Sequence, residues 1–308
     1  MQSDKSAICF PGQGAHNAQM LSKYMGMSDF ASHYRTVSDV LGFSPLERME
    51  SDSASVNSNS ISSLLTVLVS RLAFLGYRQS GQPADFLSGY SVGQYTALHF
   101  SGCFEFDQLV AIVAKRAQLM DRCFENKKGS MIAIAGVPQA NIEELLKELN
   151  DEGLHIWISN YNCFGQYSLA GEKKAIDETL KRAQRLEPKR LVELPVGGAW
   201  HSPLLNEAMG EFETFLQTMN WNAPNTPVIN NVTGELMPTS VDAIKSELVK
   251  HLSHPVMWEK GIRTLIASGC KTFTEVGYGN VLTKFGFFID RNLDFKTFSG
   301  EAQAVCAE

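Results

Sequence analysis

Apolar residues near the start of the chain occur in short runs and in one longer helical repeat. The run Ala-Ile-Cys-Phe at 7–10 leads into Pro-Gly-Gln-Gly at 11–14, which predicts a buried strand that ends in a tight turn. Residues 61–76 are apolar at helical spacing and stop at a glycine, which predicts a core helix. Residues 84–88 predict a second short strand, and the small-residue turn after them opens a helix that extends to about Phe100.

A further helix is predicted to start near Asp107, a residue type suited to the N-cap position. Its apolar face is formed by residues at spacings of three and four: Leu109, Ile112, Val113 and Met120. Arg116 falls on the same face, where a guanidinium needs a charged partner or incurs a large desolvation cost. Its planar fork suits a carboxylate, and that carboxylate belongs either to an internal Asp or Glu or to a bound ligand.

The pattern changes at residue 129, where strands and helices of similar length begin to alternate. Across 129–195 their order is β-α-β-β-α-β, which is the order of a ferredoxin-like unit. Beyond this stretch, short apolar runs at 226–229 and 272–276 again alternate with helical segments. The sequence therefore predicts an α/β protein with an inserted unit.

The chain length fits two parts, because 308 residues exceed the usual size of one domain, roughly 100–200 residues. We predict a large α/β domain with a mostly parallel sheet, formed by residues 1–128 and 196–308. A ferredoxin-like small subdomain is predicted at 129–195.

Composition narrows the class of protein further. The hydrophobic share of 44% and the charged share of 19% are ordinary for a globular protein. A formal net charge of −6 argues against a nucleic-acid partner, which would favour a strongly basic face. The start of the chain lacks an apolar stretch of signal-peptide length, and no apolar run approaches the ~18 residues of a membrane helix. We predict a cytoplasmic protein that acts on small molecules or on other proteins, with no membrane partner.

The six cysteines are widely scattered and form no CxxC pair and no metal-ligand spacing with histidine. They are predicted to be reduced thiols, mostly in the core, and no metal site is expected. The predicted small subdomain carries many basic residues interleaved with acidic ones. They form either a docking face for an acidic partner or a solvated helix face, and both hypotheses stay open. The basic residues are Lys173, Lys174, Lys181, Arg182, Arg185, Lys189 and Arg190.

The turn after the second predicted strand contains Gly89-x-Ser91-x-Gly93, the pattern of a nucleophile elbow. In such a turn the glycines relieve crowding and the serine is exposed at the start of a helix. Backbone N–H groups and the helix dipole there can stabilise an oxyanion. Ser91 is therefore the candidate nucleophile.

A serine nucleophile needs a base, and His201 is the best placed of the seven histidines. It ends a strand-like run and precedes Ser202 and Pro203, which look like an N-cap and a first helical position. A histidine just before a helix can project into a cleft. A surface loop position is the alternative interpretation.

With these motifs the chain resembles, over nearly its whole length, the malonyl-CoA:acyl-carrier-protein transacylases and the acyltransferase domains of polyketide synthases. Several ordered motifs at family-like spacing are more specific than any single one. Besides the GxSxG turn they are PGQG at 11–14, KRAQLM at 115–120, NYN at 160–162 with GQ at 165–166, GAWHSP at 198–203, NVTG at 231–234, PVMW at 255–258 and EVG at 275–277.

The resemblance implies a ping-pong acyl transfer. Ser91 would attack a malonyl thioester of coenzyme A while His201 takes its proton, and the phosphopantetheine thiol of an acyl carrier protein would then accept the acyl group. The backbone N–H groups of Gln13 and Val92 would form the oxyanion hole, and Arg116 would bind the malonyl carboxylate. Asn160 and Asn162 would line the acyl pocket. No cofactor is implied, since coenzyme A is a substrate.

The sequence departs from the family pattern close to these residues. Tyr90 stands where most members have histidine, Gln94 where most have glutamate, and Trp200 where malonyl-selective members have phenylalanine. Tyr90 and Trp200 are therefore candidate acyl-pocket residues that could change acyl selectivity. His251 replaces a glutamine in the segment whose backbone carbonyl orients the catalytic histidine in the family, and Tyr278 replaces a proline.

Other functions stay open at this stage. Tyr90, Gln94 and Trp200 motivate a transferase for an unusual carrier-bound acyl group, or an acyl hydrolase that uses water. A catalytically silent module that only docks carrier proteins is a third hypothesis. The joint presence of Ser91 and His201 with Gln13 and Arg116 argues against it. An α/β-hydrolase esterase is disfavoured because no acidic triad member is evident.

Overall fold

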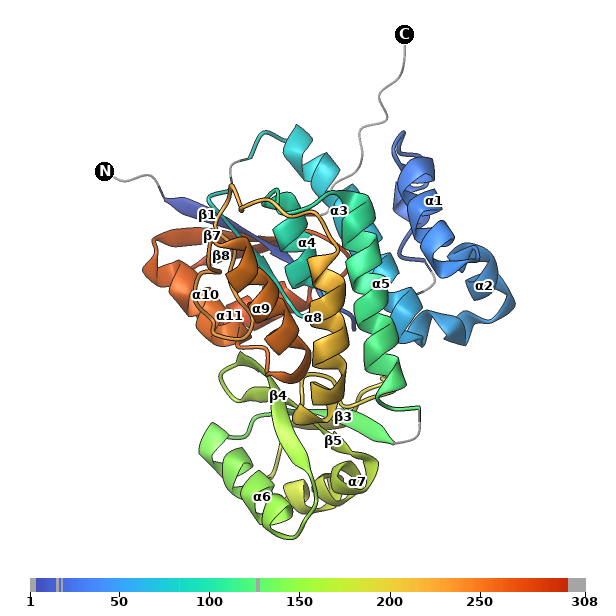
Figure 1. Ribbon diagram of the computed structural model, residues 1–308. Helices are drawn as coiled ribbons and strands as arrows, with labels where there is room; N and C mark the ends of the chain where they lie inside the picture. Colours follow the sequence, from blue (N-terminus) through green and yellow to red (C-terminus); the bar gives the residue numbers. More distant parts are fainter. Residues whose placement is uncertain (1–3, 15–16, 18, 83, 126–127, 299–308) are drawn as a thin grey trace. The chain divides into compact units, whose positions relative to one another are not determined.

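The structure is a computed structural model that describes residues 4–14, 17, 19–82, 84–125 and 128–298 (Figure 1). The chain forms two compact units, each assembled from separate segments. The first unit contains Met1–Ala114, Asn220–Ile229 and Thr264–Glu308, and the second contains Lys115–Met219 and Asn230–Arg263.

A four-stranded parallel sheet forms the centre of the first unit, with the strand order β2-β1-β7-β8. Its strands are β1 (Lys5–Phe10), β2 (Phe86–Gly89), β7 (Cys270–Glu275) and β8 (Asp294–Thr297). The predicted strand at 84–88 thus starts two residues later. The predicted strand at 226–229 is only a bridge, in which Val228 pairs with Leu87 at the outer edge of β2. The predicted parallel sheet is confirmed.

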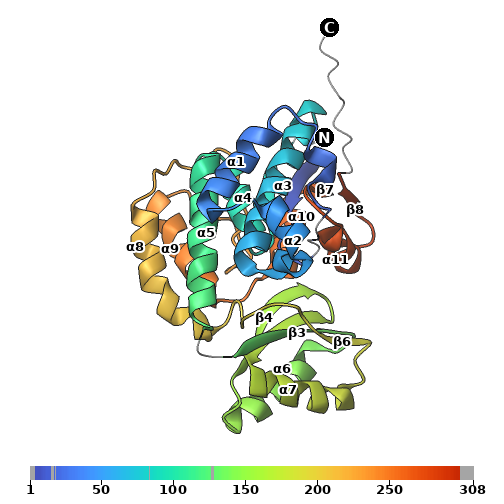
Figure 2. The same cartoon turned by 90° about the vertical axis from the view of Figure 1, so that its right-hand side faces the viewer.

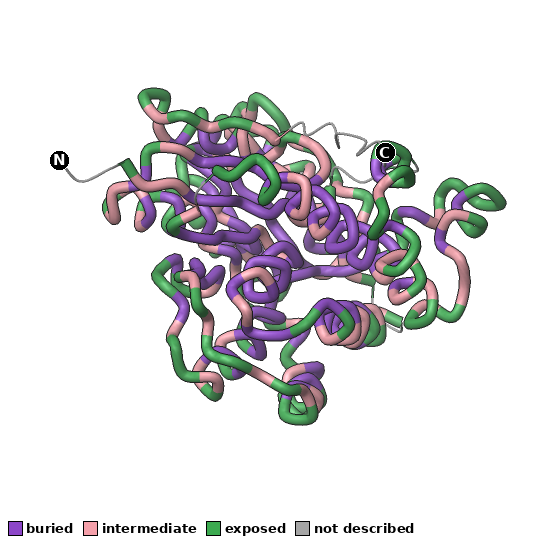
Figure 3. The backbone as a smooth tube through the Cα atoms, turned by 90° about the horizontal axis from the view of Figure 1, so that it is seen from above, coloured by how far each residue is buried: buried purple, intermediate pink, exposed green. Residues whose placement is uncertain are grey.

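Helices surround this sheet, and the predicted core helix is α3. It spans 21 residues and is long and apolar enough to cross a membrane, which the sequence analysis did not expect of any segment. However, 78% of its most apolar window is buried, as in the core helix of a globular unit. Buried stretches of the chain are purple in Figure 3. The helices are α1 (Phe30–Leu41), α2 (Pro45–Ser51), α3 (Asn59–Gln79), α4 (Gly93–Phe100) and α11 (Val281–Ile289), with 3-10 turns η1 (Ser22–Tyr24) and η2 (Ser53–Asn57).

Two helices continue from one unit into the other: α5 (Phe106–Arg122) and α10 (Trp258–Ala267). Helix α5 begins at Phe106, so Asp107 lies in its first turn and is not the N-cap that the sequence suggested. An acidic side chain in the first turn still favours the helix through its dipole. Arg116 is fully buried, as its place on the apolar face predicted.

The second unit contains a four-stranded antiparallel sheet with the order β4-β5-β3-β6. Helices α6 and α7 cover one face of this sheet (Figure 2), and their apolar sides form one buried cluster with it. The predicted β-α-β-β-α-β order and the ferredoxin-like arrangement are confirmed. The elements are β3 (Gly129–Ala135), α6 (Gln139–Asp151), β4 (Ile156–Cys163), β5 (Gln166–Glu172), α7 (Lys173–Arg182), η3 (Ala183–Leu186) and β6 (Arg190–Glu193).

Further helices belong to the second unit: η4 (Pro203–Ala208), α8 (Met209–Gln217) and α9 (Val241–Ser253). Pro203 does occupy the first helical position, but the turn it opens is a 3-10 turn that continues into α8. The domain boundaries at 128/129 and 195/196 stay a prediction, because compactness divides the chain at other places.

Several of the basic residues on the predicted small subdomain form ion pairs. Arg182 pairs with Glu152 and Glu178, and Arg185 pairs with Glu148. Pairing of this kind fits the solvated-face hypothesis, since it neutralises charge that an acidic partner would need. A docking role for these residues stays a prediction.

The five described cysteines are buried free thiols, as predicted: Cys9, Cys103, Cys123, Cys163 and Cys270. Burial raises the pKa of Cys163 to about 12 and that of Cys270 to about 11, which makes both unreactive as thiolates. The sixth cysteine, Cys306, lies outside the described residues.

Candidate active site

Ser91 lies in the tight turn between β2 and α4, and its backbone φ is 51°. A serine rarely adopts this left-handed conformation, and such strain gathers at functional sites. Both flanking glycines are sterically required. A Cβ at Gly89 would lie 2.0 Å from the Gly93 carbonyl oxygen, and one at Gly93 would lie 2.3 Å from the Phe10 carbonyl oxygen. The turn therefore has the geometry of a nucleophile elbow.

Gln13 lies at the same edge of the parallel sheet as Ser91. Phe10 pairs with Gly89, so the turns after β1 and β2 leave the sheet side by side. The Tyr90 N–H donates to the Phe10 carbonyl oxygen at 2.9 Å and extends this pairing into the turn. Val92, the residue after the candidate nucleophile, is the N-cap of α4. The first unit thus brings together the predicted oxyanion turn, the serine and a helix N-terminus.

His201 lies in the second unit between β6 and η4, and its φ is 58°. Its Nδ1 is 2.9 Å from the backbone carbonyl oxygen of His251. A carbonyl only accepts, so Nδ1 carries the proton and the neutral ring keeps its lone pair on Nε2. The side chain is buried. The alternative of a surface loop position is wrong.

The pKa of His201 is lowered to about 3, first by burial and then by the positive charge of Arg116. The carbonyls of His251 and His254 act in the opposite direction. His201 is therefore neutral at physiological pH, the state in which an imidazole can accept a proton. Burial lowers the pKa of His251 well below its ordinary value, and His201 and Arg116 lower it further. The ring centroids of His251 and His201 are 5.0 Å apart. The second unit thus brings Arg116, His201 and His251 into one electrostatic group.

The predicted acyl-pocket residues are distributed over both units. Asn160 and Asn162 are buried on β4, where Asn160 accepts a hydrogen bond from the Ser159 hydroxyl at 2.7 Å. Trp200 packs edge-to-face against Phe124 with ring centroids 5.3 Å apart.

Tyr90 belongs to the first unit, and its ring centroid lies 6.0 Å from that of Phe285 on α11. The side-chain amide of Asn17 donates to the Tyr278 hydroxyl oxygen at 2.6 Å. The Tyr278 phenol therefore links the turn after β7 to Asn17.

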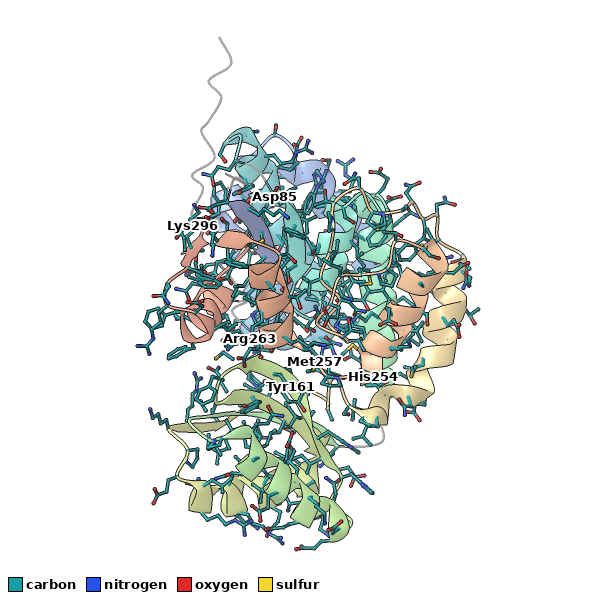
Figure 4. All side chains as sticks on the ribbon, turned by 90° about the vertical axis from the view of Figure 1, so that its left-hand side faces the viewer. Asp85, Tyr161, His254, Met257, Arg263 and Lys296 are labelled. Carbon is teal, nitrogen blue, oxygen red and sulfur yellow. The ribbon has the colours of Figure 1, made fainter. Side chains whose placement is uncertain are left out.

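A cavity of about 620 Å³ lies within the second unit and has His201 among its lining residues. Helix α6, strand β4, turn η4 and the end of α9 contribute its walls. Tyr161 and His254, which are labelled in Figure 4, both line this cavity. It provides space beside the imidazole.

Sequence reasoning missed the residues that hold Gln13. Its side-chain amide donates to the Ser62 hydroxyl at 2.6 Å and to Asn59 Oδ1 at 3.0 Å. Both lie in the first turn of α3, three residues apart and so on one helix face. The concentration of polar residues in the first turn of a largely apolar helix was the signal available in the sequence.

Comparison with known proteins defines the class. No family model matches the chain. A malonyl CoA-acyl carrier protein transacylase of Staphylococcus aureus is 33% identical over 296 residues, which are 96% of this chain and 95% of that protein. The solved structure of the Coxiella burnetii malonyl CoA-acyl carrier protein transacylase matches with a TM-score of 0.90 at 25% identity, over 97% of this chain and 95% of that one.

A second similar structure is a type II polyketide synthase acyl-carrier protein in complex with its malonyl-transacylase. It matches with a TM-score of 0.87 at 26% identity, and covers 95% of this chain and 94% of that chain. The fold and the serine elbow place the protein among the α/β acyltransferases. Within that class, the chain belongs to the family of malonyl CoA-acyl carrier protein transacylases.

Proposed function

We propose that the protein transfers a malonyl group from coenzyme A to the phosphopantetheine thiol of an acyl carrier protein, through an ester on Ser91. One observation carries this proposal. Among the described residues, only Ser91, Glu187 and His201 are non-glycine residues with positive φ, and two of these three are the predicted nucleophile and base. Family membership supports the same pair.

The reaction follows from the chemistry of these two side chains. Ser91 Oγ attacks the thioester carbonyl carbon while His201 Nε2 takes the hydroxyl proton. The tetrahedral intermediate collapses, the C–S bond breaks, and coenzyme A leaves with that proton. The carrier thiol then gives its proton to His201 and attacks the ester, which releases Ser91. A positioned base of this kind contributes about 10²–10⁴-fold in rate.

The remaining roles complete the proposal. The Gln13 and Val92 N–H groups hold the oxyanion, and each such donor is worth about 10²–10³-fold in rate. Arg116 binds the malonyl carboxylate, since a buried guanidinium is suited to bidentate pairing. The His251 carbonyl orients His201 through the Nδ1 hydrogen bond.

The proposal also covers the acyl pocket, the cofactor requirement and the cellular location of the protein. Tyr90, Trp200, Asn160 and Asn162 shape the acyl pocket. Coenzyme A serves as substrate and no cofactor is needed. The protein works in the cytoplasm.

Intact-protein mass spectrometry tests this function directly. Wild type is incubated briefly with malonyl-CoA or acetyl-CoA, and then with holo-carrier protein. We expect a malonyl adduct that is absent in Ser91→Ala, present in the exposed-serine control Ser32→Ala, and weakened in Arg116→Gln for malonyl more than for acetyl.

The second incubation separates the alternative activities. Transfer of the malonyl group to the carrier supports the proposal. Loss of the adduct to water at the same rate with and without carrier would indicate a hydrolase. If neither thioester gives an adduct, the proposed acyl transfer through Ser91 is wrong.

A further inference from the structure

Close packing fixes the first half of the oxyanion turn at 11–14. A Cβ at Gly277 would lie 2.5 Å from Pro11 Cγ, and one at Gly12 would lie 2.7 Å from the Tyr90 carbonyl oxygen. Pro11 and Gly12 are therefore wedged against their neighbours. Gly14 has φ 123°, a conformation that favours glycine, and its Cβ position meets no atom within 4 Å outside its chain neighbours among the described residues.

Hydrogen bonds to the start of α3 hold the Gln13 side chain. Its Nε2 donates to Ser62 Oγ at 2.6 Å and to Asn59 Oδ1 at 3.0 Å, and it lies 3.3 Å from the Asn59 carbonyl oxygen. An amide NH₂ has two protons, so these acceptors use its full donor capacity. Asn59 and Ser62 are both buried, in the first turn of the core helix α3.

Both acceptors are themselves oriented by further hydrogen bonds. The Ser62 hydroxyl donates its only proton to the Ser58 carbonyl oxygen at 2.8 Å, which turns its lone pairs toward Gln13. Asn59 Oδ1 also accepts from the Ser63 hydroxyl at 3.2 Å, which fixes the direction of its amide. The arrangement is thus a preformed clamp and not a chance contact.

We propose that Asn59 and Ser62 are positioning residues for acyl transfer, because they clamp the Gln13 side chain and so aim the Gln13 backbone N–H at the oxyanion. This inference rests on the proposed function, in which that N–H stabilises the tetrahedral intermediates. Loosening the clamp lowers the turnover of both half-reactions. It leaves substrate binding unchanged, because the clamp acts only where charge develops.

The test uses the full chain with four single variants and one double variant. Gln13→Ala removes the clamp and keeps the backbone N–H, and Ser62→Ala removes the shortest hydrogen bond of the clamp. We expect each to lower kcat for acyl-serine formation about tenfold with KM unchanged. The double variant should be no slower than Gln13→Ala alone, since the two side chains act through one another. Ser62→Thr retains the hydroxyl and should restore kcat.

The control is Thr66→Val, a buried position one turn further along α3 whose hydroxyl bonds only the Ser62 carbonyl among the hydrogen bonds described. It should keep wild-type kcat. A normal kcat in Ser62→Ala, or effects of the two variants that multiply, would overturn the clamp.

Hydrogen exchange separates failure of the clamp from failure of the proposed function. Amides at 12–14 should exchange faster in Ser62→Ala than in Thr66→Val, whether or not the protein makes an acyl-serine. Equal exchange in the two variants overturns the clamp, whereas faster exchange without any acyl adduct rejects only the function.

Discussion

Two buried histidines, His99 in the first unit and His201 in the second, lie near arginines but are anchored differently. In His99, Nδ1 donates to the Phe104 carbonyl oxygen at 2.7 Å, and Nε2 accepts from Arg71 Nη1 at 3.0 Å. Both of its ring nitrogens therefore serve the fold. In His201, Nδ1 donates to the backbone carbonyl oxygen of His251. Burial and then the positive charge of Arg116 lower the pKa of this ring.

The comparison shows that burial and a low pKa do not by themselves identify a catalytic histidine. Burial lowers the pKa of His99 to about 4, and that of His201 to about 3. What differs is the backbone. His99 has a regular position inside α4, whereas His201 has φ 58°, a strain that no helix or strand requires. The strained backbone conformation is the better criterion.

Replacing each histidine by glutamine gives the largest expected contrast. In His201→Gln the acyl-serine should form about 10³-fold more slowly, because the base is lost. The free energy of unfolding should change little. In His99→Gln the free energy of unfolding should fall by about 2 kcal/mol, since a buried hydrogen bond is lost, while activity per folded molecule is kept. Mass spectrometry and urea titration measure the two effects. Equal loss of activity in both variants would contradict the distinction.

The sequence was sufficient for the parts of the site that depend on local patterns. Gly89 and Gly93 revealed the elbow, because only glycine fits where backbone atoms approach so closely. The helical spacing around Arg116 revealed its burial. The alternating pattern at 129–195 revealed the antiparallel sheet and its two helices.

The remaining features depend on contacts between distant segments, which no local pattern encodes. The bond between Arg71 and His99 joins α3 to α4, and the Gln13 clamp joins residues 46 and 49 positions apart in the sequence. The compact units also divide the chain at Ala114, inside a continuous helix. The helical spacing of apolar residues continues through Ala114 without a break. The sequence therefore gives no indication that the two units divide there.

Acid should destabilise the first unit through His99. Its folded-state pKa lies below the ordinary value of 6.5, so the unfolded chain binds the proton more readily and stability falls as pH drops from about 6.5 toward 4. Arg71 and His33 lower this pKa, and Asp107 raises it. We expect a loss of about 2–3 kcal/mol between pH 7 and pH 4.5.

His99→Asn tests this pH dependence, because its amide can still donate to the Phe104 carbonyl oxygen but does not titrate. The free energy of unfolding is measured by urea titration at both pH values. The variant should lose about 2–3 kcal/mol less than wild type over this range. An identical pH dependence in wild type and variant would remove His99 as the source.

The smallest expected effect concerns His33, which accepts from Arg71 Nε at 3.1 Å on the other side of the same guanidinium. Its Nδ1 is 2.7 Å from the Asp29 carbonyl oxygen, so this ring too is fixed with its proton on Nδ1. His33→Ala should reduce the free energy of unfolding by about 1 kcal/mol, the net value of one hydrogen bond, since Arg71 keeps its bond to His99. The control is Arg35→Ala, an exposed change on the same helix. The acid-induced loss of stability should persist in His33→Ala, because His99 carries it. If that loss disappeared, it could not be assigned to His99 alone, and the contrast between His99 and His201 would not rest on a single ring.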